Sequence, residues 1–215
     1  MFKAVVFDMD GVITDTEKLY RRFQLEEGAS RGIPEDVMVC ACERIAGGNK
    51  YSNKEPFEKI VGRGIDYWEY REKVMEKLDA YIAANGVELK YGVRDTLAYL
   101  HERRIKIGLA TSTVRERAIG YLTDHDIYKY FDKLIFGDMI EHGKPAPDIY
   151  LKACEELGVQ PEEAIAVEDS INGIKSAGTA GLYPVMVIDL IKPNDEIAPY
   201  VKQVYDDVTH IRELL

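Results

Sequence analysis

The stretch A-V-V-F-D-M-D-G-V at residues 4–12 decides the fold of this chain. Its first four residues are all apolar, which is typical of a parallel strand that is covered on both faces. The run stops at Asp8, and a second carboxylate, Asp10, follows two residues later. Four later apolar runs are also followed within two residues by polar or acidic residues: 105–110, 133–136, 164–167 and 183–188. Together these runs predict five buried parallel strands.

Segments with the length and spacing of helices alternate with these runs. In the first of them, Val93, Leu97 and Leu100 share one helical face. The expected helices span 93–103, 114–123, 147–157 and 171–177. This alternation predicts an α/β fold, a doubly wound parallel sheet of the Rossmann-like type with helices on both faces.

One long segment interrupts the alternation. From residue 17 to residue 85 no buried-strand run occurs, and the pattern is helical throughout. The expected helices here are 17–27, 34–44, 52–61 and 66–84, separated by glycine- or proline-containing breaks. The sequence therefore predicts an all-helical cap of residues 16–85, inserted after the first strand into a core made of residues 1–15 and 86–215.

Charge and composition exclude several classes of protein. The 215 residues include 38 acidic and 28 basic side chains, a net charge of −10, which argues against binding to nucleic-acid phosphates. No run approaches the ~18–20 apolar residues of a membrane helix. The three cysteines (40, 42 and 154) have no disulfide or zinc spacing, and the first residues lack a signal-peptide pattern. We expect a cytoplasmic protein with reduced thiols; its oligomeric state stays open, and a monomer is possible.

Polar side chains stand just past the ends of separate strands in the predicted sheet. In open α/β sheets ligands bind at this carboxyl edge, so the fold is expected to gather these side chains. They are Asp8, Asp10, Thr111, Glu168 and Asp169. Mg²⁺ prefers oxygen ligands, and three converging carboxylates without a cation would repel one another. The sequence therefore predicts a magnesium site that includes Asp8, Asp10 and Asp169.

The same edge offers donors for a phosphate group. Thr111 and Ser112 follow a buried strand and open a helix, where hydroxyl groups and free backbone amides can meet an anion. Lys144 lies in the segment G-K-P-A-P-D at 143–148, in which two prolines stiffen the loop that carries it. These residues indicate a site for a phosphate dianion.

Four motifs, in this order, resemble those of the haloacid-dehalogenase superfamily of aspartyl-phosphate phosphotransferases. They are F-D-M-D-G-V at 7–12, L-A-T-S-T at 109–113, G-K-P-A-P-D at 143–148 and V-E-D-S-I-N-G at 167–173. The chain looks most like the branch that contains β-phosphoglucomutase and sugar-phosphate phosphatases. The resemblance spans nearly the whole chain, because the helical insert stands where this branch carries its cap.

The resemblance implies a role for each matching residue. Asp8 would be the nucleophile that becomes an aspartyl-phosphate, and Asp10 the general acid and base. Thr111 and the amide of Ser112 would bind the transferring phosphoryl group, and Lys144 would steady the nucleophile and the phosphoryl charge. The physical chemistry agrees with these roles, because a carboxylate that attacks a phosphate monoester needs positive charge to offset repulsion.

The resemblance also implies a set of metal ligands. Asp169 would bind Mg²⁺ directly, and Glu168 would be an accessory ligand. An oxygen of Asp8 and the backbone carbonyl of Asp10 would complete the protein's share.

One departure bears on the reaction type. The segment 14–16 matches the hinge of the mutase, but the mutase carries a histidine four residues beyond its second threonine, where this chain has Tyr20. A phenol is a poor proton shuttle at neutral pH, whereas imidazole is a good one. We therefore expect a magnesium-dependent phosphatase of a small phosphorylated metabolite, a sugar or polyol phosphate. The alternative is a β-phosphoglucomutase-type phosphomutase.

Other readings are weaker. Haloacid dehalogenases lack the second aspartate of the pair. Phosphonate hydrolases need a Schiff-base lysine from the cap, for which Lys18, Lys50 and Lys73 are available in principle. A non-catalytic, receiver-like phospho-acceptor also uses an acidic cluster, Mg²⁺, a threonine and a lysine, but it has no use for a large cap or for Asp10.

The cap is expected to select the substrate. Gly47 and Gly48, followed by Lys50, form a loop between two cap helices, and its glycines permit close approach of a ligand. Lys50, together with Lys73 on the long cap helix, could meet a second anionic or hydroxylated part of the substrate. We therefore expect Gly47, Lys50 and Lys73 to contribute to substrate binding.

Overall fold

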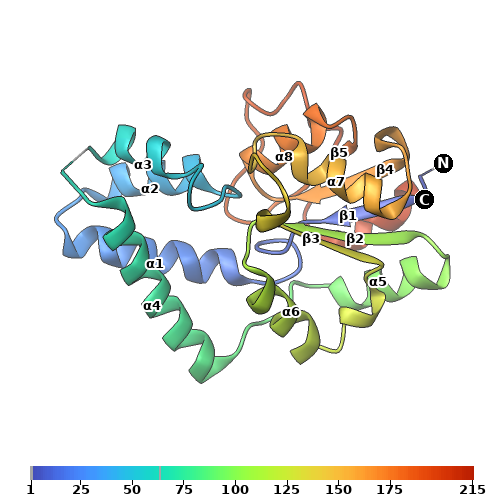
Figure 1. Cartoon of the computed structure of the whole chain (residues 1–215), viewed down its shortest axis with the longest axis horizontal. Helices are drawn as coiled ribbons and strands as arrows, with labels where there is room; N and C mark the ends of the chain where they lie inside the picture. The colour runs from blue at the N-terminus through green and yellow to red at the C-terminus, as the bar shows by residue number, and fades with distance from the viewer. Residues whose placement is uncertain (1, 63) are drawn as a thin grey trace.

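The computed structural model describes residues 2–62 and 64–215, and it shows an α/β core with a helical insert beside it (Figure 1). The predicted break at 62–64 includes residue 63, which lies outside the described residues. The six strands are β1 (Ala4–Phe7), β2 (Lys106–Thr111), β3 (Lys133–Phe136), β4 (Ala164–Glu168), β5 (Tyr183–Val187) and β6 (Gln203–Tyr205). All are parallel, in the order β3-β2-β1-β4-β5-β6. The predicted fold class is confirmed.

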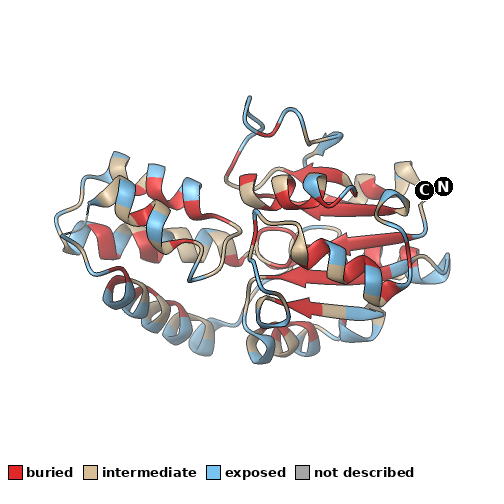
Figure 2. Cartoon of the chain, turned by 45° about the horizontal axis from the view of Figure 1, so that its top comes forward, coloured by how far each residue is buried: buried red, intermediate tan, exposed pale blue. Residues whose placement is uncertain are grey.

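The two faces of the sheet follow from the alternation of side chains along each strand. In β1, Val5 and Phe7 join one apolar cluster, and Ala4 and Val6 join another. The first cluster is covered by α5 (Val93–Glu102), α6 (Arg115–Asp124) and a 3₁₀ helix at Val208–Leu214. The second is covered by α7 (Asp148–Leu157) and α8 (Ile171–Thr179). The strands β1 to β5 are therefore largely buried between helical layers, as Figure 2 shows in red.

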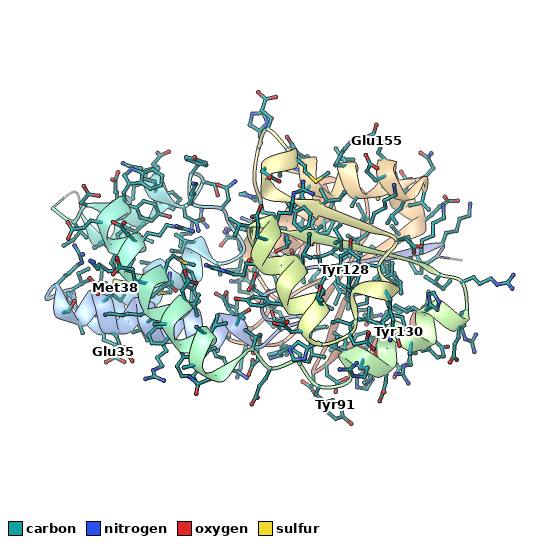
Figure 3. The ribbon with its side chains drawn as sticks, turned by 60° about the horizontal axis from the view of Figure 1, so that its bottom comes forward. Glu35, Met38, Tyr91, Tyr128, Tyr130 and Glu155 are labelled. Atoms are coloured by element: carbon teal, nitrogen blue, oxygen red, sulfur yellow. The ribbon has the colours of Figure 1, made fainter. Side chains whose placement is uncertain are left out.

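In the described residues, the regular elements of the insert between β1 and α5 are all helices. Its helices are α1 (Thr16–Ser30), α2 (Glu35–Ile45), α3 (Lys54–Val61) and α4 (Tyr67–Asn85). They enclose their own apolar core, in which the rings of Phe57 and Tyr70 lie 4.7 Å apart between centroids. Met38 of α2 (Figure 3) packs directly against Gly28 of α1, and a side chain at position 28 would collide with it. Asp66 caps α4 by accepting hydrogen bonds from two backbone amides of its first turn.

Two linkers join this cap to the core, and they are hydrogen-bonded to each other. Thr14 and Leu89 form an antiparallel bridge, flanked by hydrogen bonds from Asp15 N to Glu88 O and from Lys90 N to Ile13 O, each 2.9 Å. The second linker ends at Tyr91, a surface residue that is 78% exposed (Figure 3). The cap therefore enters and leaves the core at neighbouring points.

The strand β6 was missed in the sequence. Its three residues pair with β5 at the edge of the sheet and are exposed or half-buried, so they lack the apolar run of a central strand. As for membranes, none of the described helices has both the length and the apolar character that a bilayer-spanning segment needs.

Candidate active site

The candidate site lies at the carboxyl edge of the sheet, where the strand order reverses. β1 stands in the middle, with β2 and β3 on one side and β4, β5 and β6 on the other. At such a switch point the loops that follow adjacent strands separate and leave a crevice. Asp8 follows β1 directly, while Glu168 ends β4 and Asp169 follows it. Thr111 ends β2, so four of the expected residues are positioned by the sheet itself.

A buried lysine lies between two of these carboxylates. The Lys144 ammonium is 2.7 Å from Asp8 Oδ1 and 2.6 Å from Glu168 Oε1, and it also donates to the carbonyl of Ala110 at 3.0 Å. An ammonium group has three hydrogens to donate, so all of them have acceptors here. Lys144 is only 1% exposed. It therefore fixes Asp8 and Glu168 relative to each other.

Glu168 is held from three directions. Tyr150 Oη of α7 donates to Glu168 Oε1 at 2.6 Å, and Ser170 Oγ donates to Glu168 Oε2 at 3.1 Å. The backbone of α8 comes so close that a side chain at Gly173 would collide with this carboxylate. The position of Glu168 is therefore set by α7, α8 and Lys144 together.

Burial and like charges dominate the electrostatics of the site. Burial raises the pKa of the Asp8 carboxyl to about 8; Lys144 opposes this shift, and the charges of Glu168 and Asp10 add to it. Burial, followed by the charges of Glu17, Glu168 and Asp8, raises the pKa of Asp169 well above its ordinary range. Burial alone would lower the pKa of Lys144, but its two carboxylate partners raise it. One ammonium is thus too little positive charge for this group of acids.

A divalent cation fits this surplus of negative charge. Asp8, Glu168 and Asp169 are all buried, and each offers a carboxylate oxygen within 4.8 Å of the others. The donors are all oxygens, the ligands that Mg²⁺ prefers. Gly11, with φ of +80°, leaves room for the Asp169 carboxylate, which any side chain at that position would meet. These three residues could hold a magnesium ion.

Asp10 is oriented by two threonines from different parts of the chain. Thr113, at the start of the loop after β2, donates to Asp10 Oδ2 at 2.6 Å. Thr16, the first residue of α1, donates to Asp10 Oδ1 and also contacts Thr14 at 2.9 Å between hydroxyl oxygens. Asp10 is half-buried and faces the same cavity as Asp8. The hinge of the cap is thus tied to this carboxylate.

The expected phosphate-binding hydroxyls have distinct partners. Thr111 Oγ1 accepts a hydrogen bond from the amide of Thr113 at 3.0 Å, and the Thr111 side chain is fully buried. Ser112 Oγ donates to the carbonyl of Gly47 in the cap at 2.9 Å. Gly47 has φ of +75°, and a side chain there would collide with Ser170. The loop after β2 therefore contacts the cap loop directly.

A cavity of about 290 Å³ lies between the core and the cap. Asp8, Asp10 and Asp169 line it from the core, and Gly47 and Lys50 line it from the cap loop, as expected. The Lys50 ammonium lies 4.9 Å from the centre of the Tyr51 ring. The structure does not bring Lys73 into this lining; its exposed ammonium pairs with Glu76 at 2.8 Å.

Several cavity residues were missed in the sequence, and helical spacing could have found some of them. Arg71, Met75 and Leu78 of α4 line the cavity at intervals of four and three residues, so they share one face. Lys73 is two positions from Arg71, about 200° around the helix, and faces away. Glu17, one residue after Thr16, also lines the cavity. Its pKa is raised to about 7 by burial and then by the charge of Asp10.

The cap is docked against the core by polar contacts. Asn172, in the first turn of α8, donates to the carbonyls of Arg44 and Ala46 at 3.1 and 2.9 Å. Arg44 pairs with Glu196 of the core at 2.8 Å. On the other side of the cavity Arg117 of α6 pairs with Asp79 of α4 at 2.6 Å. These contacts close the cap over the carboxylates.

Comparisons with known proteins agree with this geometry. The family model of haloacid dehalogenase-like hydrolases matches residues 2–181. The chain is 35% identical over 182 residues to a phosphorylated carbohydrates phosphatase of Thermotoga maritima. The alignment covers 84% of this chain and 82% of that protein.

Two solved structures share the arrangement of core and cap. A β-phosphoglucomutase from Clostridium difficile is 25% identical, with a TM-score of 0.75 over 99% of this chain and 96% of that one. A CbbY mutant from Rhodobacter sphaeroides, in complex with xylulose-(1,5)bisphosphate, is 27% identical, with a TM-score of 0.74 over 96% of this chain and 95% of that one.

Proposed function

Because the chain belongs to the family of haloacid dehalogenase-like hydrolases, we propose that it is a magnesium-dependent phosphatase of a small phosphorylated metabolite, a sugar or polyol phosphate. The observation that carries the proposal is the buried group of Asp8, Lys144, Glu168 and Asp169, of which Asp8 and Asp169 line a small cavity between core and cap. In this proposal the core (residues 1–15 and 86–215) does the chemistry, and the cap (residues 16–85) selects the substrate.

The first step transfers the phosphoryl group to Asp8. A carboxylate oxygen of Asp8 attacks phosphorus, the bond from phosphorus to the substrate oxygen breaks, and Asp10 gives its proton to that leaving oxygen. Lys144 supports this role of Asp8, because its ammonium contacts the nucleophile and offsets the charge of the incoming phosphoryl group. The hydroxyl of Thr111 and the amide of Ser112 bind the phosphoryl oxygens.

The second step returns the enzyme to its starting state. Asp10, now ionised, takes a proton from water; the water oxygen attacks phosphorus, and the bond to Asp8 breaks to release inorganic phosphate. The two threonine hydroxyls that hold Asp10 keep it beside Asp8 for both proton transfers.

A magnesium ion would be held by Asp8, Glu168 and Asp169, with Asp10 as a further ligand through its backbone carbonyl. When bound, it supplies positive charge that offsets the repulsion between the phosphate and the buried carboxylates.

The similarity to β-phosphoglucomutase makes a phosphomutase the second candidate. A mutase must pass a proton to and from a second sugar hydroxyl inside the closed cap. Tyr20 lines the cavity, but burial raises the pKa of its phenol further above neutrality, so it does not exchange protons there. None of the described histidines lines the cavity. Water is therefore the favoured acceptor.

The test measures both products from the same reactions. With Mg²⁺ present, p-nitrophenyl phosphate and at least one sugar or polyol phosphate should release inorganic phosphate steadily, without a bisphosphate activator. Tyr20→Phe should keep phosphate release within about threefold, since no proton passes through the phenol. If β-glucose 1-phosphate yields glucose 6-phosphate faster than phosphate, the protein is a mutase. One phosphate bound per chain without turnover would point to a receiver-like module.

A further inference from the structure

We propose that Glu17 and Arg71 form a subsite that recognises neighbouring hydroxyl groups of a substrate with a single phosphate. This inference rests on the phosphatase function proposed above and adds the chemical class of the group that leaves. Glu17 comes from the first turn of α1, next to the hinge, and Arg71 from α4. Both line the 290 Å³ cavity above the acidic site.

Glu17 and Arg71 are charged cavity residues without a protein partner; within the described residues the same holds for Asp169, which belongs to the carboxylates that could hold Mg²⁺, and for the exposed Lys50. Neither Glu17 nor Arg71 makes a side-chain hydrogen bond or an ion pair with any residue in the described part of the chain. By contrast, Asp10 is bound by two threonines and Arg117 pairs with Asp79. A half-buried charged group without a partner costs free energy. Both side chains are therefore available to form hydrogen bonds with a ligand.

Tyr20 and the two groups line the same cavity. Burial raises the pKa of its phenol; the charge of Arg71 acts against this shift, while Tyr67 and Glu17 add to it. Glu17 stands one turn before Tyr20 on α1, and both line the cavity together with Arg71, so an acceptor group and a donor group face the same cavity. A hydroxyl both donates and accepts hydrogen bonds, so adjacent hydroxyls can satisfy a carboxylate and a guanidinium together.

The charge balance favours hydroxyl groups over a second phosphate. When Glu17 is ionised, its charge cancels that of Arg71. Arg117 is neutralised by Asp79, and Arg21, whose charge also acts on Glu17, pairs with Glu43 at 3.7 Å. A second phosphate dianion would also meet Glu17 close to Asp10, whose charge already acts on Glu17. Lys50 is exposed and stacked on Tyr51, so its charge is screened by solvent.

The remaining walls and the size of the cavity fit a short carbon chain. Met75 and Leu78 of α4 and the Tyr121 ring of α6 give apolar surface for the C–H groups of such a ligand. A volume of 290 Å³ is at the lower end of the roughly 300–1,000 Å³ that small-molecule sites span. The cavity therefore suits a monophosphate with a few carbon atoms.

The first experiment measures binding, which needs no turnover. Sorbitol 6-phosphate, glucose 6-phosphate, ribose 5-phosphate and inorganic phosphate are titrated by calorimetry into the Asp8→Asn protein with Mg²⁺. At least one of the three hydroxylated esters should bind more tightly than inorganic phosphate. Glu17→Leu and Arg71→Met should each weaken that ester about 10- to 100-fold, as expected for a hydrogen bond to a charged group, and leave inorganic phosphate within about threefold. Glu17→Gln, which keeps an acceptor oxygen, should recover part of the loss.

The second experiment separates this inference from the proposed function. Glu17→Leu and Arg71→Met are also introduced into the wild-type enzyme, which keeps Asp8. Each should lower kcat/KM for the best hydroxylated ester, mainly by raising KM. The kcat/KM for p-nitrophenyl phosphate should stay within about threefold of the wild-type value. Lys73→Met, an exposed change on the same helix, is the matched control and should alter neither. Absence of turnover on every substrate would contradict the phosphatase function, while the binding data would still decide the subsite.

Three results would overturn the inference. One is an equal loss of kcat/KM for the hydroxylated ester and for p-nitrophenyl phosphate, which would show a structural or catalytic role for these residues. Another is a set of hydroxylated esters that bind no better than inorganic phosphate. The third is fructose 1,6-bisphosphate binding tenfold more tightly than any monophosphate, with Arg71 required for the difference.

Discussion

At the scale of single residues, Lys144 carries one positive charge into a site with three buried carboxylates. Its three hydrogens are all used, so it cannot also neutralise Asp169. Burial raises the pKa of Asp8 and of Asp169, and the neighbouring carboxylate charges add to both shifts. The site is therefore built to be completed by further positive charge.

Asp8→Asn tests the nucleophile. The amide keeps the shape of the side chain but cannot attack phosphorus, so activity should fall at least about a thousandfold, the scale seen for residues that act as a catalytic unit. The melting temperature should stay the same or rise, because one of the repelling carboxylates is removed while Lys144 keeps Glu168 and Ala110. Phosphate release and thermal unfolding measure the two effects. More than a tenth of wild-type turnover would show that Asp8 is not the nucleophile.

Removal of the metal tests whether the buried carboxylates hold a magnesium ion that the reaction needs. A chelator should abolish turnover, and Mg²⁺ should restore it. Mg²⁺ should also raise the melting temperature of the chelated protein, because a ligand bound only by the folded state stabilises it. Asp169→Ala should raise the Mg²⁺ concentration needed for both effects. Full activity in excess chelator would contradict a magnesium mechanism.

The residues that the sequence could identify are those that the sheet itself positions. Asp8, Glu168 and Asp169 stand at the ends of neighbouring parallel strands, so the topology brings them together whatever the side chains around them do. The hydrogen bonds from Tyr150 to Glu168 and from Thr113 to Asp10 depend instead on how α7 and the loop after β2 pack. No local pattern encodes those contacts.

At the scale of elements, α1 and α4 are clamped together by a charged contact away from the cavity. Glu27 of α1 accepts hydrogen bonds from Lys77 of α4 and from Arg31, each at 2.8 Å. Burial alone would raise the pKa of Glu27, but these two cations lower it below its ordinary value. The clamp therefore requires the ionised carboxylate.

The pH dependence of Glu27→Gln tests this clamp. A carboxylate whose pKa is lower in the folded state adds stability above its unfolded pKa of about 4.5, and that stability is lost as the pH falls through the folded value. The variant should therefore melt at a lower temperature than the wild type at pH 7, and the difference should shrink steadily below pH 4.5. Glu55→Gln, at an exposed pair on α3, is the control and should change little. A difference that does not depend on pH would contradict the clamp.

The helices and central strands could be read from the sequence because each has a strong pattern of its own. The helix α4 shows the limit of such patterns. Its periodicity defines its faces, but which face meets the cavity depends on how it packs against α1. Lys73 is the residue expected at the substrate, whereas Arg71 lines the cavity. The edge strand β6 shows the same limit, because its pairing with β5 is a tertiary contact.

At the scale of the whole molecule, the side chain of Asn172 is one of the contacts that hold the cap against the core, because it donates to two carbonyls at the end of α2. Asn172→Ala should speed backbone hydrogen exchange at residues 44–49 and lower kcat/KM about 2- to 10-fold, as the loss of neutral hydrogen bonds implies. Gln203→Ala, an exposed change on β6, should alter neither quantity. Unchanged exchange in the Asn172 variant would show that other contacts hold the cap.

The paired linkers have a consequence for how such a molecule can be altered. Because Asp15 and Glu88 are joined by a backbone hydrogen bond, the 72 residues between them form an insert whose two ends lie side by side. A segment of any length with adjacent ends can leave and rejoin the sheet there without distorting it. This junction is therefore a natural point for exchanging the cap: a cap from another protein, spliced between residues 15 and 88 with a threonine kept at position 16 to bind Asp10, should leave the reactive carboxylates in place and bring its own substrate preference.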